Sequence, residues 1–251
     1  MNQKTAIITG GSRGLGRDMA INLAKDGVDV IFSYHSNVER ANEVISEIKE
    51  LGQDAVAFQF DANDYQSGQK FIEEVTAYLL EKNGTPSFDF LVNNAGTGAF
   101  NLVADTTLEQ FDEMMNVHLK SVFFLTQAAL PYLNEGGRII NISSGLARFS
   151  LPGMSAYAMM KGGIEVFTRY LAKELGGRKI TANVIAPGAI ATEFAGGSNK
   201  QEDKRAIISS ITALGRVGEA EDVGGTVAFL CSDRAGWING QRIEVSGGML
   251  V

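Results

Sequence analysis

The chain has 251 residues, of which 45% are hydrophobic and 20% charged, with a net charge of −7 and an isoelectric point of about 5.0. An acidic chain without basic runs is a poor candidate for binding nucleic acid or an anionic membrane surface. The single cysteine, Cys231, excludes an intrachain disulfide, and no cysteine and histidine cluster predicts a metal site. Since no apolar run approaches the ~20 residues of a membrane helix, and the N-terminal run is too short for a signal peptide, we expect a cytoplasmic protein.

Short apolar segments alternate with longer amphipathic ones along the chain. Strands that are apolar on both faces suit a sheet covered on both sides, and their alternation with helices is typical of βαβ units. We therefore predict an α/β fold: a single domain over 1–251, built on a Rossmann-type doubly wound seven-stranded parallel sheet with helices on both faces. The predicted strands are 5–9, 28–34, 54–60, 89–92, 137–143, 179–186 and 241–245, and the predicted helices are 15–26, 38–51, 64–82, 107–133, 155–176 and 219–231.

Residues 192–213 interrupt this alternation. The segment is polar, contains glycine, is only weakly periodic and follows Pro187-Gly188. We interpret it as a mobile substrate flap within the domain, and a plain surface excursion is the alternative.

A glycine-rich turn, TGGSRGLG at 9–16, joins the first predicted strand to the first helix. Glycines allow a tight turn and a close approach of the backbone to a ligand, and a helix N-terminus favours a pyrophosphate. No Gly-Lys-Ser/Thr follows, so this is not a Walker loop. The turn predicts a nucleotide-binding site formed by Gly10, Ser12, Arg13, Gly14, Leu15 and Gly16.

The stretch SAYAMMK places Tyr157 four positions before Lys161. On a helix, residues four apart lie on the same face and near enough to interact. An isolated pair of this kind is usually a surface contact, so the pair gains meaning only from the other motifs of the chain.

Six motifs together resemble the short-chain dehydrogenase/reductase family, in particular its 3-oxoacyl reductase-like and carbonyl reductase members. The resemblance covers nearly the full length, to the C-terminal GQRIEVSGGM. In chain order the motifs are Thr9-Gly10-x-x-x-Gly14-Leu15-Gly16, Asn93-Asn94-Ala95-Gly96, Asn116, Ser143-Ser144, Tyr157-x-x-x-Lys161 and Pro187-Gly188.

The resemblance implies a nicotinamide dinucleotide, and the end of the second strand indicates which one. An acidic residue there binds the 2′-hydroxyl of NAD, but this chain has Tyr34 at that position and no carboxylate in SYHS. Arg13 lies in the glycine turn, where its guanidinium suits a 2′-phosphate, and His35 could add a hydrogen bond. We therefore predict NADP(H) in preference to NAD(H), although either side chain could instead be a solvated surface residue.

Further cofactor contacts are implied by the resemblance alone. Asp61 and Ala62 would hold the adenine, and the stretch from Asn93 to Gly96 would flank the adenosine ribose. Asn93 could instead only tie strands together. The remaining implied contacts, which include those near the nicotinamide, are Asn94, Ala95, Pro187, Gly188, Ile190, Thr192, Tyr157 and Lys161.

Tyr157 is the predicted proton donor of the reaction. A free tyrosine titrates near pH 10, so proton exchange near neutrality needs a pKa about three units lower, or roughly 4 kcal/mol. A unit charge about 4 Å away provides about that much at an effective dielectric near 20. We therefore expect Lys161 to lower the pKa of Tyr157, and the resemblance adds hydrogen bonds from Lys161 to the nicotinamide ribose.

Two further side chains complete the predicted catalytic set. Ser144 ends the fifth strand and could hold the substrate oxygen; Ser143 is the alternative, which strand alternation points to the other face. The resemblance assigns Asn116 to a helix position that helps hold a water for proton relay to the lysine. His118, two positions on, should face elsewhere and is interpreted as structural.

These features predict an NADPH-dependent oxidoreductase that reversibly reduces a small-molecule ketone to a secondary alcohol. The alternative is a 3-oxoacyl-thioester reductase acting on acyl carrier protein, which Glu135, Lys173 and the acidic charge disfavour. More remote alternatives are a non-catalytic dinucleotide sensor and a nucleotide-sugar epimerase or dehydratase. Apolar residues that could line the substrate pocket, or instead pack against the flap or a neighbouring subunit, are Phe100, Leu146, Phe149, Leu151, Met154 and Phe194.

The expected partners are a small-molecule carbonyl substrate and copies of the chain itself. The resemblance implies a homotetramer built from the helices near 107–133 and 155–176 and the C-terminal strand. We expect neither nucleic acid nor a membrane as a partner.

Overall fold

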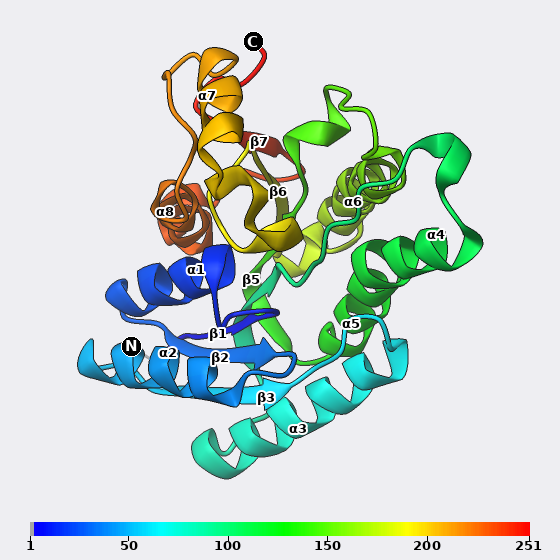
Figure 1. Ribbon diagram of the computed structural model, residues 1–251. Coiled ribbons are helices and arrows are strands. Elements are labelled where there is room, and N and C mark those ends of the chain that lie inside the picture. Colours follow the sequence, from blue (N-terminus) through cyan, green and yellow to red (C-terminus); the bar gives the residue numbers. More distant parts are fainter. Residues whose placement is uncertain (1–2) are drawn as a thin grey trace.

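The computed structural model describes residues 3–251, so residues 1 and 2 of the predicted domain lie outside the described part. Seven parallel strands form one sheet in the order β3-β2-β1-β4-β5-β6-β7 (Figure 1). The order changes direction between β1 and β4, the switch point at which doubly wound folds bind ligands. The strands are β1 (Thr5–Ile8), β2 (Asp29–Tyr34), β3 (Ala55–Gln59), β4 (Phe88–Asn93), β5 (Leu133–Ile142), β6 (Thr181–Pro187) and β7 (Arg242–Val245).

Helices cover both faces of this sheet, which confirms the predicted doubly wound α/β fold (Figure 1). One face packs against α1 (Gly14–Lys25), α2 (Val38–Glu50) and α8 (Glu221–Cys231), and the other against α3 (Tyr65–Asn83), α5 (Ser121–Ala129) and α6 (Ser155–Glu174). The other helices are α4 (Leu108–Met115) and α7 (Glu202–Ser210). Short 3₁₀ turns are Val103–Asp105, Gly145–Ala147, Gly176–Arg178, Phe194–Lys200 and Asp233–Ala235.

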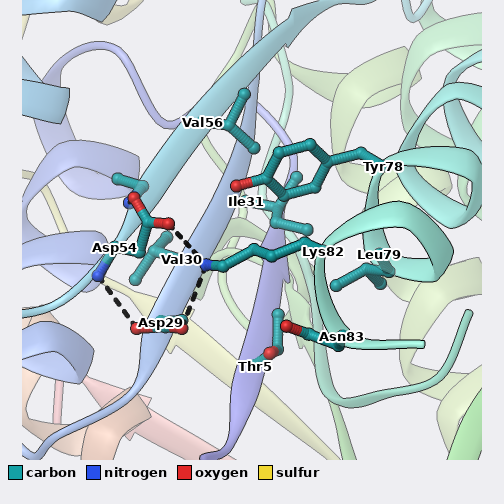
Figure 2. A pocket seen from close by; sticks show the side chains of 11 residues that line it. Thr5, Asp29, Val30, Ile31, Asp54, Val56, Tyr78, Leu79, Lys82 and Asn83 are labelled. Atoms are coloured by element: carbon teal, nitrogen blue, oxygen red, sulfur yellow. Dashed lines mark hydrogen bonds and ion pairs between the residues drawn. The ribbon is translucent and has the colours of Figure 1, made fainter. Parts of the chain in front are cut away.

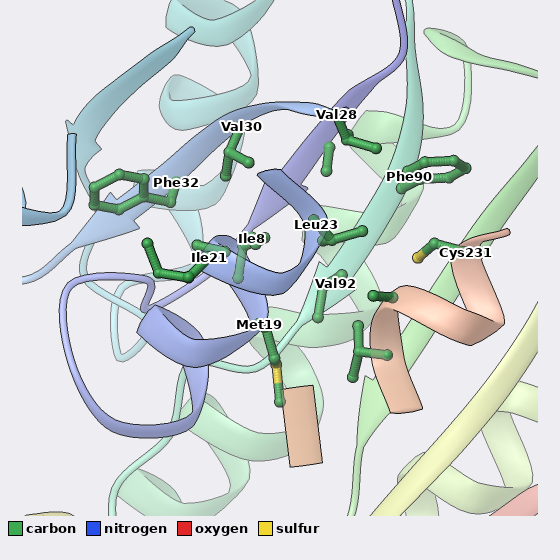
Figure 3. Packing of buried hydrophobic residues seen from close by; sticks show 14 of the residues in the cluster. Ile8, Met19, Ile21, Leu23, Val28, Val30, Phe32, Phe90, Val92 and Cys231 are labelled. Atoms are coloured by element: carbon green, nitrogen blue, oxygen red, sulfur yellow. The ribbon is translucent and has the colours of Figure 1, made fainter. Parts of the chain in front are cut away.

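Alternating strand residues divide the interior into two hydrophobic cores. In β1, Ala6 and Ile8 join the core under α1 and α8, whereas Ile7 joins the core under α3 and α5. Figure 3 shows the first of these cores, with Met19 and Leu23 of α1 packed near β1 and β4. The buried start of α1 is therefore held by the sheet and by α8, which positions the glycine turn before it.

A charged cluster lies at the edge of the sheet where the strands begin, opposite the carboxyl edge (Figure 2). Lys82, in the last turn of α3, lies 2.5 Å from Asp54 and 3.4 Å from Asp29. Asp29 also accepts the backbone N–H of Asp54 at 2.9 Å. Lys82 holds the pKa of Asp54 below its usual range, and its contacts with both aspartates tie α3 to β2 and to the residue before β3. It lies away from the carboxyl edge and has a structural role.

The long helix predicted over 107–133 is interrupted in the structure. A capping box of Thr107 and Gln110 starts α4, but one π-helical turn, Asn116–Lys120, separates α4 from α5. Such π turns are found mostly inside α-helices and frequently at functional sites. Within the segment 192–213, the 3₁₀ turn Phe194–Lys200 is followed by α7.

Candidate active site

The glycine turn before α1 has no room for side chains at two of its glycines. A Cβ on Gly16 would lie 2.6 Å from Asn94 Nδ2, and one on Gly11 would lie 2.6 Å from the Cβ of Phe32. Gly10 and Gly14 adopt positive φ angles of 71° and 54°, which favour glycine. The turn therefore needs glycine for its own geometry.

The N-terminus of α1 is available to an anion. Side chains cap α2 and α3, whereas Arg13, at the N-cap of α1, makes no side-chain cap. The free N–H groups of this first turn and the helix dipole favour a pyrophosphate. Ser12 and Leu15 also lie in this turn, and Leu15 packs partly against the hydrophobic core.

The motif that ends β4 holds the glycine turn in place. Thr9 Oγ1 accepts the backbone N–H groups of Asn94 and Ala95 at 2.9 Å each, and Asn94 Nδ2 donates to the carbonyls of Thr9 and Gly10. Gly96 continues this loop and is exposed.

The side chain of Asn93 turns away from this loop into a buried polar network. Its Nδ2 donates to Asn141 Oδ1 at 2.7 Å and to Thr126 Oγ1 at 3.0 Å, and Asn141 Nδ2 donates to Thr168 Oγ1 at 2.9 Å. The network joins β4 and β5 to α5 and α6. The structure therefore gives the Asn93 side chain the strand-tying role that the sequence left as the alternative.

The ends of β2 and β3 form one side of the site. Tyr34 ends β2 and packs partly against the core, and Ser33 Oγ accepts the N–H of Gly10 at 2.9 Å. His35 and Asp61 face each other across this edge, with His35 Nε2 3.9 Å from Asp61 Oδ2. Ala62, next to Asp61, packs partly against the other hydrophobic core.

Two arginines meet near this end of the site. Arg13 Nη1 lies 3.2 Å from Glu193 Oε2, and Arg40 Nη1 lies 2.6 Å from the same oxygen. A second bond, of 3.1 Å, joins Arg40 Nη2 to Glu193 Oε1. Sequence reasoning missed Arg40, because its position in the first turn of α2 belongs to no motif. It also missed Glu193, whose partners are more than 150 residues away in the sequence.

The structure brings Tyr157, Lys161 and Ser144 together at the carboxyl edge. Tyr157 and Lys161 lie on one face of α6 and are 7% and 4% exposed, and Lys161 Nζ lies 5.6 Å from the centre of the Tyr157 ring. Ser144 follows β5 and hydrogen-bonds with the Tyr157 hydroxyl. Lys161 Nζ also donates to the Ile142 carbonyl at 2.7 Å, which fixes the ammonium beneath the tyrosine.

Burial dominates the ionisation of this pair. Desolvation raises the pKa of Tyr157 to about 12, against a smaller lowering by the hydrogen bond with Ser144. Desolvation also lowers the pKa of Lys161 to about 8. The pKa of Tyr157 is therefore raised in this structure and not lowered as predicted, because the cost of burying a phenolate exceeds the effect of the Ser144 hydrogen bond. Tyr157 is a protonated phenol at neutral pH.

Asn116 does not join this group. It begins the π turn, and its side chain donates to Asn63 Oδ1 at 3.4 Å. His118 instead reaches the tyrosine: the two rings meet edge to face at 4.9 Å, and the Lys161 charge contributes to the His118 pKa. In a helix, residues two positions apart point to different sides, so only one of them can face α6. The expectation that His118 faces elsewhere is wrong.

His118 is fully buried and neutral. Desolvation, with a smaller effect of Lys161, lowers its pKa to about 3. Its Nε2 lies 2.7 Å from the Thr97 carbonyl, so Nε2 carries the proton, and Nδ1 has no protein partner among the described residues. A Cβ on Gly96 would lie 2.8 Å from His118 Cε1, so glycine at 96 leaves room for the ring.

The loop after β6 closes the site from the other side. Pro187 ends β6 and is buried, and a Cβ on Gly188 would lie 2.8 Å from the backbone of Ser246. Ile190 is buried and forms an isolated bridge with Gly218. Thr192 packs over the glycine turn, since a Cβ on Gly14 would lie 3.5 Å from its side chain.

Apolar side chains lie around Tyr157. The ring of Phe194 lies 5.8 Å from that of Tyr157, and Leu146 and Met154 pack partly against the cluster that contains Tyr157. Phe100 and Leu151 are mostly exposed and lie farther out on the surface. Phe149 contacts Arg148 and limits the space at Gly145.

A charged network that the sequence did not reveal supports the loop after β5. Ser143 Oγ donates to Glu165 at 2.8 Å, which confirms that Ser143 and Ser144 have different surroundings. Arg242 joins Glu165 to Glu244 at 2.7 and 2.8 Å. Arg148 binds Glu244 through two nitrogens, at 2.7 and 2.8 Å, and so ties the loop to the C-terminal segment.

Two classes of site find no support in the part of the chain that the structure describes. Residues 3–251 contain no group of three or more histidine, cysteine, aspartate or glutamate side chains that could hold a metal ion. None of the helices described for this chain is long and apolar enough to cross a membrane.

Comparison with known proteins identifies the family. The family model described as enoyl-(acyl carrier protein) reductase matches residues 10–250. The 3-oxoacyl-[acyl-carrier-protein] reductase FabG of Staphylococcus aureus is 38% identical over 248 residues, which cover 98% of each chain. The short chain dehydrogenase/reductase dmxR18 of Cryptosporiopsis sp. is 34% identical over 259 residues, covering 99% of this chain and 96% of that protein.

Solved structures agree with this assignment. The angucycline C-6 ketoreductase LanV, with bound NADP, is 37% identical, with a TM-score of 0.94 over 98% of this chain and 95% of LanV. LugOII, a promiscuous reductase that catalyses keto-reduction at C1 in lugdunomycin biosynthesis, is 37% identical, with a TM-score of 0.94 over 99% and 98% of the two chains. A blue fluorescent protein from a metagenomic library, in complex with NADPH, is 34% identical, with a TM-score of 0.92 over 100% and 99%.

The doubly wound sheet and its carboxyl-edge site place the chain among the oxidoreductases of this fold class. Within that class, the chain belongs to the short-chain dehydrogenase/reductase family.

Proposed function

We propose that this protein is an NADP(H)-dependent carbonyl reductase that reduces a ketone to a secondary alcohol and also runs in reverse. The observation that carries the proposal is the buried, protonated Tyr157, hydrogen-bonded with Ser144 and placed above Lys161. Support for the substrate class comes from similarity to LanV and LugOII, which are described as reductases of keto groups.

The residues around the glycine turn fit a dinucleotide. The turn excludes side chains at Gly11 and Gly16, so backbone groups can approach a pyrophosphate at the uncapped end of α1. Arg13 and Arg40 already hold one anion, the Glu193 carboxylate, which favours a binding site for the 2′-phosphate. This is the basis for preferring NADP(H) to NAD(H).

The other predicted contacts follow the course of the cofactor across the carboxyl edge. Asp61 and Ala62 would lie by the adenine, backbone groups of Asn94, Ala95 and Gly96 by its ribose, and Lys161 by the nicotinamide ribose. Tyr34 and His35 would flank the 2′-phosphate. At the nicotinamide end, the contacts would come from Tyr157, Pro187, Gly188, Ile190 and Thr192.

The chain supplies the proton of the reaction. When bound, NADPH provides the hydride that forms the new bond at the carbonyl carbon. Ser144 donates a hydrogen bond to the carbonyl oxygen and Tyr157 donates its phenolic proton to the same oxygen, which becomes the alcohol hydroxyl. The phenolate that remains is stabilised by the ammonium of Lys161 and regains its proton from solvent.

Asn116 was predicted to help hold a water for proton relay. Its side chain donates to Asn63, and among the described residues it has no hydrogen bond with Tyr157 or Lys161. We propose instead that His118 positions the tyrosine. Its neutral ring lies against Tyr157, and its Nε2–H donates to the Thr97 carbonyl. A neutral ring does not oppose the positive charge of Lys161 during proton transfer.

A 3-oxoacyl-thioester reductase is the second candidate, because FabG is 38% identical over nearly the whole of both chains. One activity screen separates the two functions: assorted ketones and 3-oxoacyl thioesters, each with NADPH and with NADH. Turnover confined to thioesters on acyl carrier protein would favour this second candidate, and strong preference for NADH would refute the assignment of NADP(H).

The proton-donor role is tested by Tyr157→Phe. The variant keeps the ring that packs against His118 and Phe194 but removes the phenolic proton that Tyr157 would donate to the substrate, so we expect a loss of turnover of at least about 100-fold. Cofactor binding should persist, and can be measured by the fluorescence of NADPH. Full activity of the variant would refute the assignment, and cofactor binding without turnover by the wild-type protein on every carbonyl would revive the sensor alternative.

Assembly as a homotetramer stays a prediction. Large apolar side chains are exposed on α5 and α6, among them Phe123 and Tyr170, and Trp237 is 99% exposed before β7. Burying such patches between copies would stabilise an oligomer. Light scattering after size-exclusion chromatography measures the number of subunits, and a monomer at micromolar concentration would contradict the prediction.

A further inference from the structure

Glu193 lies between two cationic side chains that come from separate parts of the fold. Arg13 precedes α1 and Arg40 lies in the first turn of α2, and both guanidiniums contact the same Glu193 oxygen, at 3.2 and 2.6 Å. The hydrogen bond from Arg40 is the main cause that holds the pKa of Glu193 below its usual range. The carboxylate is therefore ionised at neutral pH.

The residues on either side of Glu193 extend this contact across the site. Thr192 packs over Gly14 of the glycine turn, and the Phe194 ring lies 5.8 Å from the Tyr157 ring. A Cβ on Gly98 would lie 2.8 Å from the Ala195 Cβ, so the segment also rests on the loop after β4. Four consecutive residues thus join the arginines at one end of the site to the catalytic tyrosine at the other.

The backbone after Phe194 is suited to a change of conformation. Ala195, Gly196 and Gly197 all have positive φ, at 50°, 73° and 72°. Two glycines adopt this region without cost, whereas Ala195 is held there against its preference. Its conformation is maintained by the contacts of Glu193 and Phe194 and by the loop that contains Gly98.

A 2′-phosphate and the Glu193 carboxylate would need the same two guanidiniums. A phosphate monoester carries about −1.5 to −2 charges at neutral pH, against −1 for a carboxylate, and offers three acceptor oxygens. It is therefore the stronger ligand for a pair of arginines.

We propose that Glu193 is an electrostatic latch that competes with the 2′-phosphate of NADP(H) for Arg13 and Arg40. Binding of the phosphate releases Glu193, and with it the neighbouring Phe194 moves from Tyr157, so the cofactor that carries the hydride also uncovers the proton donor. NAD(H) lacks the phosphate and leaves the latch closed. This inference rests on the proposed binding of NADP(H) at the same site.

The test separates the phosphate from the rest of the cofactor. Adenosine 2′,5′-bisphosphate carries the 2′-phosphate without a nicotinamide, and adenosine 5′-monophosphate lacks the 2′-phosphate. With the wild-type protein, we expect the bisphosphate, and not the monophosphate, to speed hydrogen–deuterium exchange in residues 192–213. In Glu193→Gln, exchange there should be fast without ligand and insensitive to either compound.

Calorimetry provides the second readout. Glu193→Gln should bind the bisphosphate about fivefold more tightly than wild type, equivalent to about 1 kcal/mol, and the monophosphate within about twofold. The matched control is Glu202→Gln, in the first turn of α7, which removes the same charge from the same segment. Among the described contacts Glu202 has no arginine partner, so this variant should behave as wild type.

The remaining outcomes refute the latch, and they show whether the binding of NADP(H) fails with it. If Glu193→Gln gains nothing for the bisphosphate, or if Glu202→Gln gains as much, the latch is refuted while binding of NADP(H) stands. Equal acceleration of exchange by both compounds would also refute it. If the wild-type protein binds both compounds equally, Arg13 and Arg40 do not recognise the phosphate, and the preference for NADP(H) fails together with the latch.

Discussion

Replacing Gly16 by alanine tests whether the glycine turn is the cofactor site. The new Cβ would overlap the carbonyl oxygen of Gly10 and would lie 2.6 Å from Asn94 Nδ2. Ordinary contacts begin at 3.4 Å, so the amide would have to move by about 0.8 Å and the Gly10 carbonyl by more than that. Either movement strains the bonds from Asn94 to the carbonyls of Thr9 and Gly10, which are 2.9 and 3.1 Å long.

The expected cost can be worked from these contacts. Losing two hydrogen bonds costs about 1 kcal/mol each, and overpacking adds about 1 to 3 kcal/mol. Alanine returns about 1 kcal/mol of helix propensity, so the free energy of unfolding should fall by about 2 to 4 kcal/mol. Since the displaced backbone is also the expected pyrophosphate contact, affinity for NADPH should fall by about 100-fold or more.

The assay combines thermal unfolding with titration of NADPH, and the control is Gly225→Ala. Gly225 lies in α8, is exposed, and has no atom within 4 Å of a Cβ placed on it. That variant should gain about 0.5 to 1 kcal/mol of stability and bind NADPH normally. The reasoning would be refuted if Gly16→Ala folded and bound NADPH like wild type.

Two further predictions concern a buried ring and a half-buried charge. His118→Ala should lower kcat by about tenfold, because Tyr157 loses its edge contact and the Thr97 carbonyl loses its partner. Since the His118 pKa is about 3, the pH profile of kcat near neutrality should keep its shape in this variant. Loss of an ionisation near neutrality would contradict the positioning role of His118. The bond with Arg148 lowers the pKa of Glu244 from 4.5 to about 2, so its contribution to stability is complete above about pH 4.5 and is lost as the pH falls toward 2. Unfolding of wild type and Glu244→Gln should therefore differ at pH 7 and converge in acid, and a constant difference down to pH 3 would show that another group controls this region.

Features that depend on residues close together along the chain could be predicted from the sequence. Alternation of apolar strands and amphipathic helices determines a parallel sheet, because each strand must be covered on both faces. The glycine spacing at 9–16 reports a local backbone requirement, which the close contacts of Gly11 and Gly16 explain. The spacing of Tyr157 and Lys161 places them on one helical face, where the structure has them.

Features that depend on distant segments or on burial needed the tertiary structure. The π turn in the middle of the long helix brings His118, not Asn116, to Tyr157, and no local signal in NVHLK predicts that choice. The direction of the Tyr157 pKa shift follows from desolvation, which a sequence does not measure.

The arginines around Glu193 show the same division between what local spacing predicts and what tertiary contacts decide. Arg13 was visible in the glycine turn, but its pairing with Arg40 around Glu193 joins three parts of the chain that only folding brings together. The sequence by itself determined the fold class, the dinucleotide turn and the tyrosine–lysine pair, since each depends on local spacing. Tertiary structure decided which side chains surround them and with what charge, because contacts and desolvation arise only between packed elements.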